Sequence, residues 1–196
     1  MKILLAIPSA RYVENECWIS IFEMQKTGDI ELFVPASYSV DVARNLIVRY
    51  AQENKFDYIF WVDSDMILPK DALVRMMSHN KDIVAGCYVK KLLNGRTVVA
   101  KYRNAETDEY TDLEISEIRK AKGIIPVDAF GFGCVLTKVD MFEKIPYPWF
   151  IYTMEMGEDV YFCRKAQNCG YDMWLDTDVI CGHKGSVNFD IRGKEE

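Results

Sequence analysis

The sequence predicts an α/β fold in which a mixed, mainly parallel central sheet is flanked by helices. Short apolar runs alternate with helix-periodic stretches over residues 1–89, the order expected when parallel strands are joined by crossover helices. The run from Tyr58 to Val62 is apolar throughout and too short for a helix, which suits a strand buried on both faces. The 196 residues, 49% of them hydrophobic, are enough for one domain with a sizeable core and leave little room for two.

The first half of the chain gives the clearer elements. Pro8 and Ser9 stop the first apolar run, Gly28 ends the first helix, and Pro69 begins the third. The second helix carries apolar residues at helical spacing, namely Ala43, Leu46, Ile47, Tyr50 and Ala51. We therefore predict strands over residues 2–7, 30–34, 58–62 and 82–89, and helices over residues 15–26, 40–51 and 69–80.

The second half is less regular. Residues 90–122 are polar and charged, with 97–102 the only clear strand, and Asn94-Gly95 is typical of a hairpin turn. Apolar residues return at 124, and we expect strands over 124–127, 173–175 and 179–181 and helices over 139–144 and 158–166. Gly170 ends the last helix. A single domain with an irregular middle insertion is the simplest organisation.

Composition excludes some classes of function. A net charge of −6 argues against a general nucleic-acid binder, although it allows a small nucleotide. The N-terminal apolar run lacks a small-residue cleavage site, and no run is long enough for a transmembrane segment. Six cysteines without a CxxC pair indicate free thiols in a reducing, cytoplasmic compartment: Cys17, Cys87, Cys134, Cys163, Cys169 and Cys181.

Two carboxylates, Asp63 and Asp65, follow the strand 58–62 with Ser64 between them. Side chains alternate along a strand, so we expect both carboxylates on one face, where they repel each other and are costly to desolvate. A divalent cation with oxygen ligands removes that cost. An N-cap and turn before the helix at Pro69 is the alternative.

Other residues are expected at the same edge of the sheet. Ligands of open α/β sheets bind beyond the carboxyl ends of the strands, where Asp63, Asp65, Pro8 and Ser9 all lie. Arg44 sits early in a helix on the way into the third strand, and its alternative role is that of a solvated or ion-paired helix residue. A cation, an arginine and a strand-end loop together suit a diphosphate.

Two further motifs follow in the second half. Glu158 and Asp159 begin a helix, either as acidic caps or with one carboxylate as a general base. His183, in a Gly-His-Lys-Gly segment, has little apolar context and suits binding of Mn²⁺ or phosphate. His79 is expected at the surface or as a helix C-cap. A zinc site of His183 with Cys163, Cys169 and Cys181 is disfavoured, since the spacings do not match zinc ligand pairs.

Gly131 and Gly133 flank Phe132 in a run that leads into an apolar segment. Two glycines around an aromatic residue indicate a tight bend or bulge, or a backbone that a ligand can approach closely.

In this order, the strand with Asp63-Ser64-Asp65, the Gly131-Phe132-Gly133 loop, Gly157-Glu158-Asp159 and Gly182-His183 resemble the motifs of glycosyltransferases with the GT-A fold. The resemblance is to family 2 and to small viral and phage-type members, and it runs from Met1 to about Gly185. It implies a nucleotide-binding half over residues 1–89 and an acceptor-binding, catalytic half over residues 90–196.

The resemblance also implies roles. Asp65 binds Mn²⁺ or Mg²⁺ directly, Asp63 binds the ribose or the metal through water, and His183 is a C-terminal metal or diphosphate ligand. Asp159 is the general base of an inverting enzyme, and Glu158 positions hydroxyl groups. The donor, a nucleotide-diphosphate sugar with UDP favoured, is contacted by the remaining residues: Pro8, Ser9, Arg44, Ser64, Gly131, Phe132 and Gly133.

The implied acceptor is a glycan or glycosylated molecule. The chain ends soon after His183, without the C-terminal acceptor or membrane-docking segment of many members, and could be one domain of a larger product. Two other functions stay open. A sugar-nucleotide nucleotidyltransferase is disfavoured, because the loop after the first strand, Pro8-Ser9-Ala10-Arg11-Tyr12, has no glycine. A catalytically inactive glycan-binding domain is the non-enzymatic alternative. The donor sugar, the acceptor and the oligomeric state are not determined by the sequence.

Overall fold

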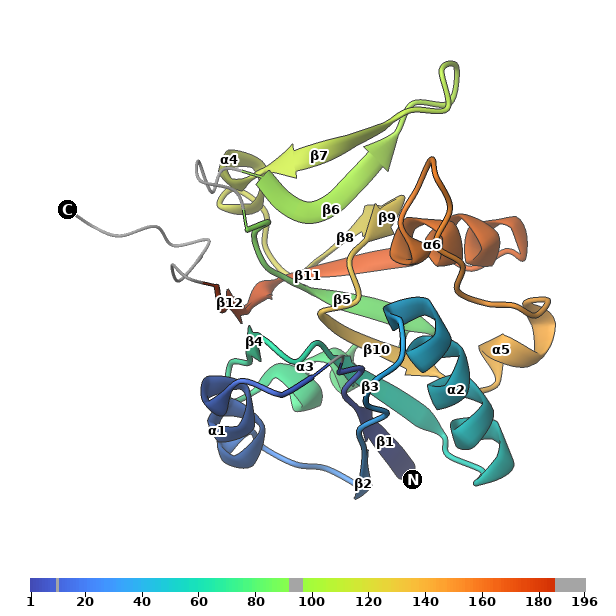
Figure 1. Cartoon of the computed structure of the whole chain (residues 1–196). Helices are drawn as coiled ribbons and strands as arrows, with labels where there is room; N and C mark the ends of the chain where they lie inside the picture. The colour runs from blue at the N-terminus through green and yellow to red at the C-terminus, as the bar shows by residue number, and fades with distance from the viewer. Residues whose placement is uncertain (10, 92–96, 186–196) are drawn as a thin grey trace.

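A seven-stranded sheet forms the centre of the protein (Figure 1). The structure is a computed structural model and describes residues 1–9, 11–91 and 97–185. In spatial order the strands are β2 (Asp29–Phe33), β1 (Lys2–Ala6), β3 (Tyr58–Val62), β10 (Cys134–Lys138), β5 (Ile83–Cys87), β11 (Met173–Ile180) and β8 (Ile124–Val127).

The sheet is mixed and mainly parallel, as predicted. Strands β2, β1 and β3 are parallel neighbours, and so are β5 and β11. Strand β10 pairs antiparallel with both β3 and β5, and β8 pairs antiparallel with β11. Because β10 is antiparallel to both β3 and β5, those two strands run in the same direction. The carboxyl ends of β1, β3 and β5 therefore meet at one edge of the sheet, where ligands of such sheets bind.

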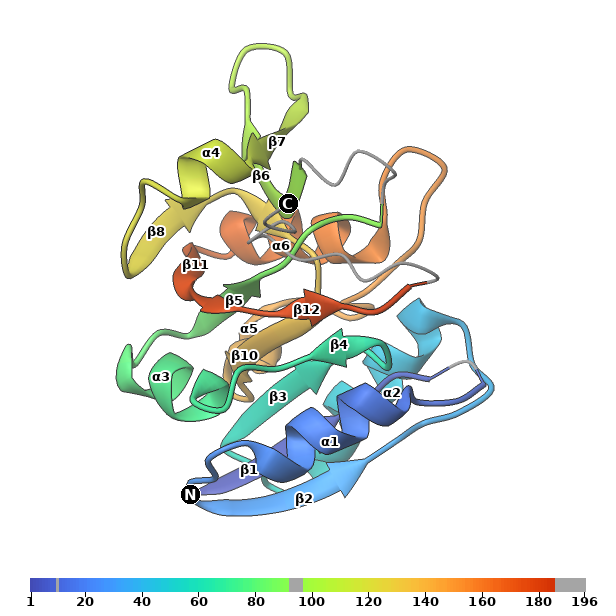
Figure 2. The same cartoon turned by 90° about the vertical axis from the view of Figure 1, so that its left-hand side faces the viewer.

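Helices cover both faces of the sheet (Figures 1 and 2). Alternate side chains of one strand enter two separate apolar clusters, as Trp61 and Phe60 of β3 show, because successive side chains point to opposite faces. Helices α2, α5 and α6 supply side chains to one cluster, and α1 and α3 supply the other. The helices are α1 (Asn15–Glu23), α2 (Val40–Glu53), α3 (Ala72–Ser78), α4 (Ile115–Ile118), α5 (Met141–Lys144) and α6 (Glu158–Asn168).

Two small sheets complete the fold. Strand β12 (Gly182–His183) pairs antiparallel with β4 (Met66–Ile67), so the C-terminal part of the chain lies against the turn that follows β3. Strand β6 (Thr97–Arg103) pairs with β7 (Tyr110–Glu114) on one side and with β9 (Ala129–Phe130) on the other. The β6–β7 hairpin rises above the main sheet (Figures 1 and 2).

Several predicted boundaries are wrong. Helix α1 ends at Glu23 and not at residue 26, because Met24 turns to an extended conformation and is buried. The two strands expected over 173–175 and 179–181 are one strand, β11, whose pairing with β5 shifts between Asp176 and Ile180. The sequence pattern predicts no strand over residues 134–138, yet β10 lies in the middle of the sheet.

The middle insertion is more ordered than its composition indicates. Besides β6 it contains β7 and the short helix α4, which begins with a capping box between Glu114 and Glu117. The residues on either side of the predicted turn do pair, since the amide of Lys90 donates to the carbonyl of Thr97 over 3.0 Å. The Asn94-Gly95 turn itself lies outside the described residues.

The cysteines are free thiols, and all except the half-buried Cys169 are buried. Over the described residues, no helix combines the length and the apolar character needed to cross a membrane.

Candidate functional site

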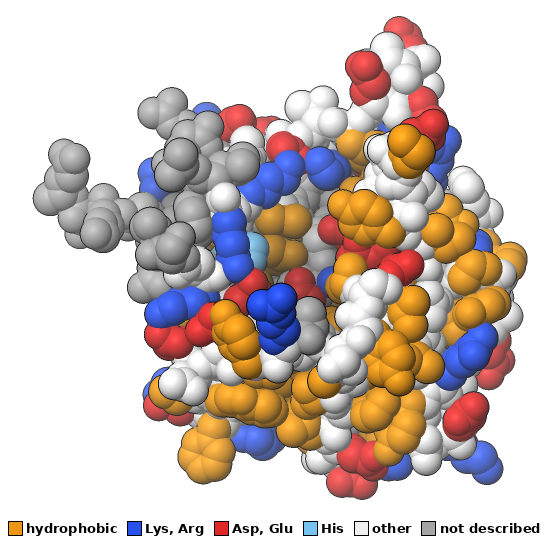
Figure 3. Space-filling view, viewed as in Figure 1, with side chains coloured by type: hydrophobic (Ala, Val, Ile, Leu, Met, Phe, Trp, Pro, Cys, Tyr) orange, Lys and Arg blue, Asp and Glu red, His pale blue; other side chains and the backbone are white. Residues whose placement is uncertain are grey.

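A cavity of about 290 Å³ opens at the carboxyl ends of β1, β3 and β5. Figure 3 shows a hollow in the middle of the face of the molecule that it draws, where acidic and basic side chains gather. Most of the predicted site residues line it together: Pro8, Ser9, Arg44, Asp63, Ser64, Asp65, Phe132, Glu158, Asp159 and His183. Residues more than a hundred positions apart in the sequence therefore meet in one cavity.

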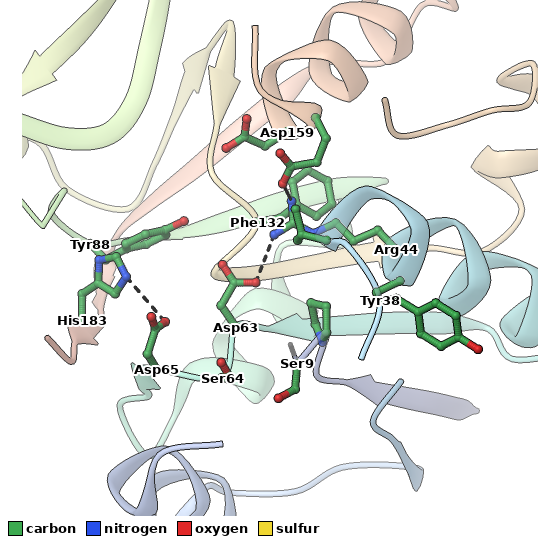
Figure 4. Close-up of a pocket in the computed structure, with 14 residues that line it drawn as sticks. Ser9, Tyr38, Arg44, Asp63, Ser64, Asp65, Tyr88, Phe132, Asp159 and His183 are labelled. Carbon is green, nitrogen blue, oxygen red and sulfur yellow. Dashed lines mark hydrogen bonds and ion pairs between the residues drawn. The ribbon is translucent and has the colours of Figure 1, made fainter. Parts of the chain in front are cut away.

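Asp63 and Asp65 share this cavity for a reason different from the predicted one. Strand β3 ends at Val62, and Asp63, Ser64 and Asp65 form a turn that the amide of Met66 closes on the carbonyl of Asp63 over 3.1 Å. The alternation argument is therefore wrong for these residues. Both carboxylates nevertheless point into the cavity, on the wall opposite Asp159 (Figure 4).

Arg44 lies beneath the cavity and joins its two sides. Its side chain is only 3% exposed; one guanidinium nitrogen lies 3.0 Å from Asp63 Oδ1 and another bonds Glu158 Oε1. The guanidinium also faces the rings of Phe132 and Phe150, 5.2 and 5.9 Å from their centroids. Arg44 is thus a buried, ion-paired residue that connects the turn after β3 to the start of α6.

Burial and the neighbouring charges shift the pKa values of Arg44 and of Glu158. Burial by itself lowers the pKa of Arg44, but the carboxylates of Asp63, Glu158 and Asp159 raise it overall. Burial raises the pKa of Glu158, and the neighbouring Asp159 adds to this effect, while Arg44 opposes it. Arg44 therefore opposes the protonation of Glu158 that burial favours.

Asp65 and His183 form a second pair, 3.5 Å apart between Oδ1 and Nε2. The β4–β12 pairing brings them together, since His183 lies opposite Met66. His183 Nδ1 lies 2.9 Å from the carbonyl oxygen of Val89, which only an N–H can satisfy, so Nε2 is the nitrogen that faces Asp65; with a proton it donates to the carboxylate, and without one it offers a lone pair to a cation. A divalent cation between Nε2 and the carboxylate would take the place of that proton, and a backbone carbonyl that accepts from the other ring nitrogen is typical of metal-bound histidine.

The residues present therefore fit a divalent cation, with two ligands and not three. Asp63 pairs with Arg44, so it does not converge with Asp65 and His183, and no group of three His, Cys, Asp or Glu ligands occurs within the described residues. Two protein ligands suffice for Mg²⁺ or Mn²⁺ when phosphate oxygens supply others. Asp65 Oδ2 also bonds the ammonium of Lys91.

The pKa of Asp65 reflects these neighbours. Partial burial alone raises it, but the hydrogen bonds and charges of His183 and Lys91 lower the pKa overall. Asp65 is therefore ionised at neutral pH, as a metal ligand or phosphate-site carboxylate must be.

Asp159 stands on the α6 side of the cavity, half-buried in the first turn of the helix. Its Oδ1 accepts a hydrogen bond of 2.7 Å from the amide of Val160, which holds the carboxylate in place. Gly157 comes just before it, and a Cβ there would lie 2.8 Å from Asp159 Oδ1. A fixed carboxylate facing the cavity is placed to accept a proton from a bound hydroxyl group.

Pro8 and Ser9 form the floor near β1. Ser9 is buried, and its hydroxyl donates to the carbonyl of Tyr12 over 3.0 Å. Tyr38, which the sequence analysis missed, lines the rim with half of its surface exposed. It precedes α2 in an irregular segment, where no sequence signal marks it.

Gly131 and Gly133 do not line the cavity within the described chain; they pack under Tyr88. A Cβ on Gly131 would lie 2.3 Å from Tyr88 Oη, and one on Gly133 would lie 2.8 Å from the same atom. The amide of Gly133 donates to Tyr88 Oη over 2.9 Å. The glycines thus make room for Tyr88, a cavity residue that sequence analysis missed although it follows strand β5.

The two remaining sequence hypotheses concern histidine and cysteine. Over the described residues, His183 and the cysteines do not form a group of three metal-ligating side chains. His79 caps the end of α3, as one of the two alternatives predicted, but it is not a simple surface residue. Its Nε2 lies 2.6 Å from Asp176 Oδ2, and Asp176 is fully buried.

No protein-family model matches the chain, and no curated protein matches it. Among solved structures, it is similar to A197 from STIV, with a TM-score of 0.73 and 21% identity over 99% of this chain and 92% of that one. It is also similar to GalNAc-T7 crystallised with UDP, GalNAc and Mn²⁺, with a TM-score of 0.57 and 10% identity. That match covers 93% of this chain and 43% of the other. At these identities the similarity concerns the fold alone, and the chain has an α/β fold of the GT-A-like type.

Proposed function

We propose that the protein is a metal-dependent glycosyltransferase that moves a sugar from a nucleotide-diphosphate sugar to an acceptor hydroxyl group. One observation carries the proposal: a single cavity holds the Asp65–His183 pair on one wall and the fixed carboxylate of Asp159 on the other. The first suits a cation and a diphosphate, and the second suits a general base. A fold shared with GalNAc-T7, whose crystals contain UDP, GalNAc and Mn²⁺, supports the same conclusion.

The donor occupies the half formed by residues 1–89. Pro8, Ser9 and Tyr38 contact the nucleoside, and Ser64 and Asp63 lie toward the ribose and diphosphate. Asp65 and His183 hold Mn²⁺ or Mg²⁺, which supplies positive charge to the diphosphate leaving group. A UDP-sugar is the favoured donor.

The acceptor and the reaction belong to the half formed by residues 90–196. Asp159 accepts the proton of the acceptor hydroxyl group while the oxygen of that hydroxyl group attacks the anomeric carbon. The bond from that carbon to the diphosphate oxygen breaks, the diphosphate leaves with the electron pair, and the anomeric configuration inverts. Arg44 holds Glu158 at the edge of the cavity, where this carboxylate positions sugar hydroxyls.

A thermal-shift screen tests the proposal, with UDP, GDP, dTDP and CMP each added with and without Mn²⁺. A nucleotide at a hundred times its dissociation constant adds about 2.7 kcal/mol of stability, or about 5 to 11 °C in melting temperature for a chain of this size. We expect one nucleotide to stabilise the protein in the presence of Mn²⁺. Hydrolysis or transfer is then measured with the corresponding sugar nucleotide.

Two variants form the matched comparison. Asp65→Asn should abolish the Mn²⁺-dependent shift, whereas Asp57→Asn, at the opposite end of β3, should retain it. Nucleotide binding without any turnover would favour an inactive glycan-binding domain. Release of pyrophosphate from a nucleoside triphosphate and a sugar phosphate would favour a nucleotidyltransferase. The absence of any nucleotide-dependent shift would refute the proposal.

A further inference from the structure

The ammonium group of Lys91 occupies one oxygen of the carboxylate proposed to bind the metal. It bonds Asp65 Oδ2, while His183 Nε2 faces Asp65 Oδ1. Both side chains of the Lys91–Asp65 pair are about one-third exposed, so the pair lies where solvent and ligands reach it. In the ligand-free protein, Lys91 thus supplies the positive charge that this carboxylate requires.

Lys91 and the orientation of His183 depend on the same short segment. Residues 88–91 follow β5, and within them the Val89 carbonyl accepts the hydrogen bond that fixes the His183 ring. The Tyr88 ring and that imidazole are arranged edge to face, with an interplanar angle of 87° and the centroids 5.3 Å apart. The segment therefore contributes both the carbonyl group that orients His183 and the ammonium group of Lys91, which competes with a metal ion for Asp65.

A divalent cation and an ammonium group on one carboxylate repel each other strongly at such short range. Binding of Mn²⁺ at Asp65 therefore favours departure of Lys91, which then lacks a counter-ion. A diphosphate, with several anionic oxygens, is a suitable new partner for an ammonium group.

A second hollow, of about 390 Å³, adjoins the first and shares Ser64 and Asp65 with it. Three basic side chains, Arg11, Lys91 and Lys184, line this hollow. The ammonium group of Lys184 pairs with Glu16 and not with the carboxylate of Asp65. The hollow gives Lys91 space beside the metal position in which to meet phosphate oxygens.

We propose that Lys91 is a displaceable internal counter-ion of Asp65 that makes binding of the divalent cation and binding of the diphosphate mutually dependent. The inference rests on the proposed function and adds to it a positioning residue that no motif marks. In the free protein Lys91 weakens binding of the metal alone. In the loaded protein it strengthens binding of the nucleotide, so each ligand raises the affinity for the other.

The test uses Mn²⁺ alone as its first probe, with free Mn²⁺ measured by electron paramagnetic resonance. Lys91→Met removes the charge and keeps an unbranched side chain of similar length. We expect this variant to bind Mn²⁺ about tenfold more tightly than the unchanged protein, because one competing charge has gone. Lys90→Met is the control, since Lys90 pairs with Asp112 and not with Asp65; it should bind Mn²⁺ as the unchanged protein does.

The second probe is UDP, GDP or dTDP, titrated by calorimetry with and without Mn²⁺. The factor by which Mn²⁺ strengthens nucleotide binding should be smaller in Lys91→Met than in the unchanged protein, by about tenfold. The melting temperature of each variant without ligand confirms that it is folded.

Two failures are distinguishable. If the unchanged protein binds a nucleotide with Mn²⁺ but Lys91→Met changes neither the Mn²⁺ affinity nor the coupling, the inference about Lys91 is wrong and the proposed function stands. If neither Mn²⁺ nor any of the nucleotides binds the unchanged protein, the proposed function fails and the inference fails with it.

Discussion

Replacing Arg44 by methionine is the sharpest test of how the cavity is held together. The change leaves two carboxylates, Asp63 and Glu158, without the guanidinium that joins them, and Glu158 is 7% exposed. Removing one partner of a buried ion pair costs about 3 to 5 kcal/mol. For a chain of this size that corresponds to a fall in melting temperature of about 6 to 20 °C.

The loss of unfolding free energy caused by Arg44→Met should depend on pH. The pKa of Glu158 is already raised, mainly by burial, and losing Arg44 raises it further. A group whose pKa is raised on folding binds its proton more readily in the folded state, so the folded state loses stability as pH rises through that range. The destabilisation by Arg44→Met should therefore be largest at neutral pH and shrink as the pH falls toward the pKa of Glu158.

Urea denaturation measures this, with the midpoint and slope recorded at pH 7 and pH 5. Arg49→Met is the matched control, because Arg49 lies on the same helix, is exposed, and stacks over the Tyr147 ring at 4.5 Å. It should cost no more than about 1 kcal/mol. Combining Arg44→Met with Glu158→Gln should recover about 1 kcal/mol or more. The reasoning would be refuted if Arg44→Met lowered the unfolding free energy no more than Arg49→Met does. It would also be refuted if adding Glu158→Gln to Arg44→Met restored none of the lost unfolding free energy.

Three other changes have definite expectations. Gly131→Ala places a Cβ against Tyr88 and should cost about 1 to 3 kcal/mol in unfolding free energy, measured by urea denaturation. His79→Ala removes a hydrogen-bond partner of the buried Asp176 and should cost about 1 to 3 kcal/mol at pH 7 by the same measurement. Partial burial alone raises the pKa of Asp112, but its hydrogen bonds to two lysines lower it overall, below its ordinary 3.8. Stability from this group is therefore present above pH 3.8 and lost as the pH falls through the lowered pKa, so Asp112→Asn should flatten the decline in unfolding free energy below pH 4.

Controls accompany these three. Tyr88→Phe removes the hydroxyl that a Cβ on Gly131 would meet, and it should lessen the cost of Gly131→Ala. An exposed acidic residue, changed as Asp172→Asn, should leave the acid limb of the stability curve unaltered. An unchanged unfolding midpoint in Gly131→Ala or His79→Ala would contradict the packing or hydrogen bonding described for that residue.

The sequence by itself determined the mainly parallel sheet and most of the residues that line the cavity. Apolar runs and helical spacing are local properties, so the parallel sheet and its crossover helices follow from them. The position of Asp63, Asp65, Pro8 and Ser9 at strand ends placed them at one edge of the sheet. The placement of Glu158 and Asp159 in the same site came from the resemblance to GT-A glycosyltransferases and not from a local sequence pattern.

Only the tertiary structure decided which charges pair. Arg44 meets Glu158 across 114 positions, and Lys91 meets Asp65 across 26, and neither separation leaves a periodic signal in the sequence. Likewise, Gly131 and Gly133 pack under Tyr88, which no spacing of glycines indicates. The hydrophobic pattern of the sequence indicates which face of a helix or strand is buried. Which carboxylate pairs with which cationic side chain depends on the distances between them, and these exist only after the sheet has formed.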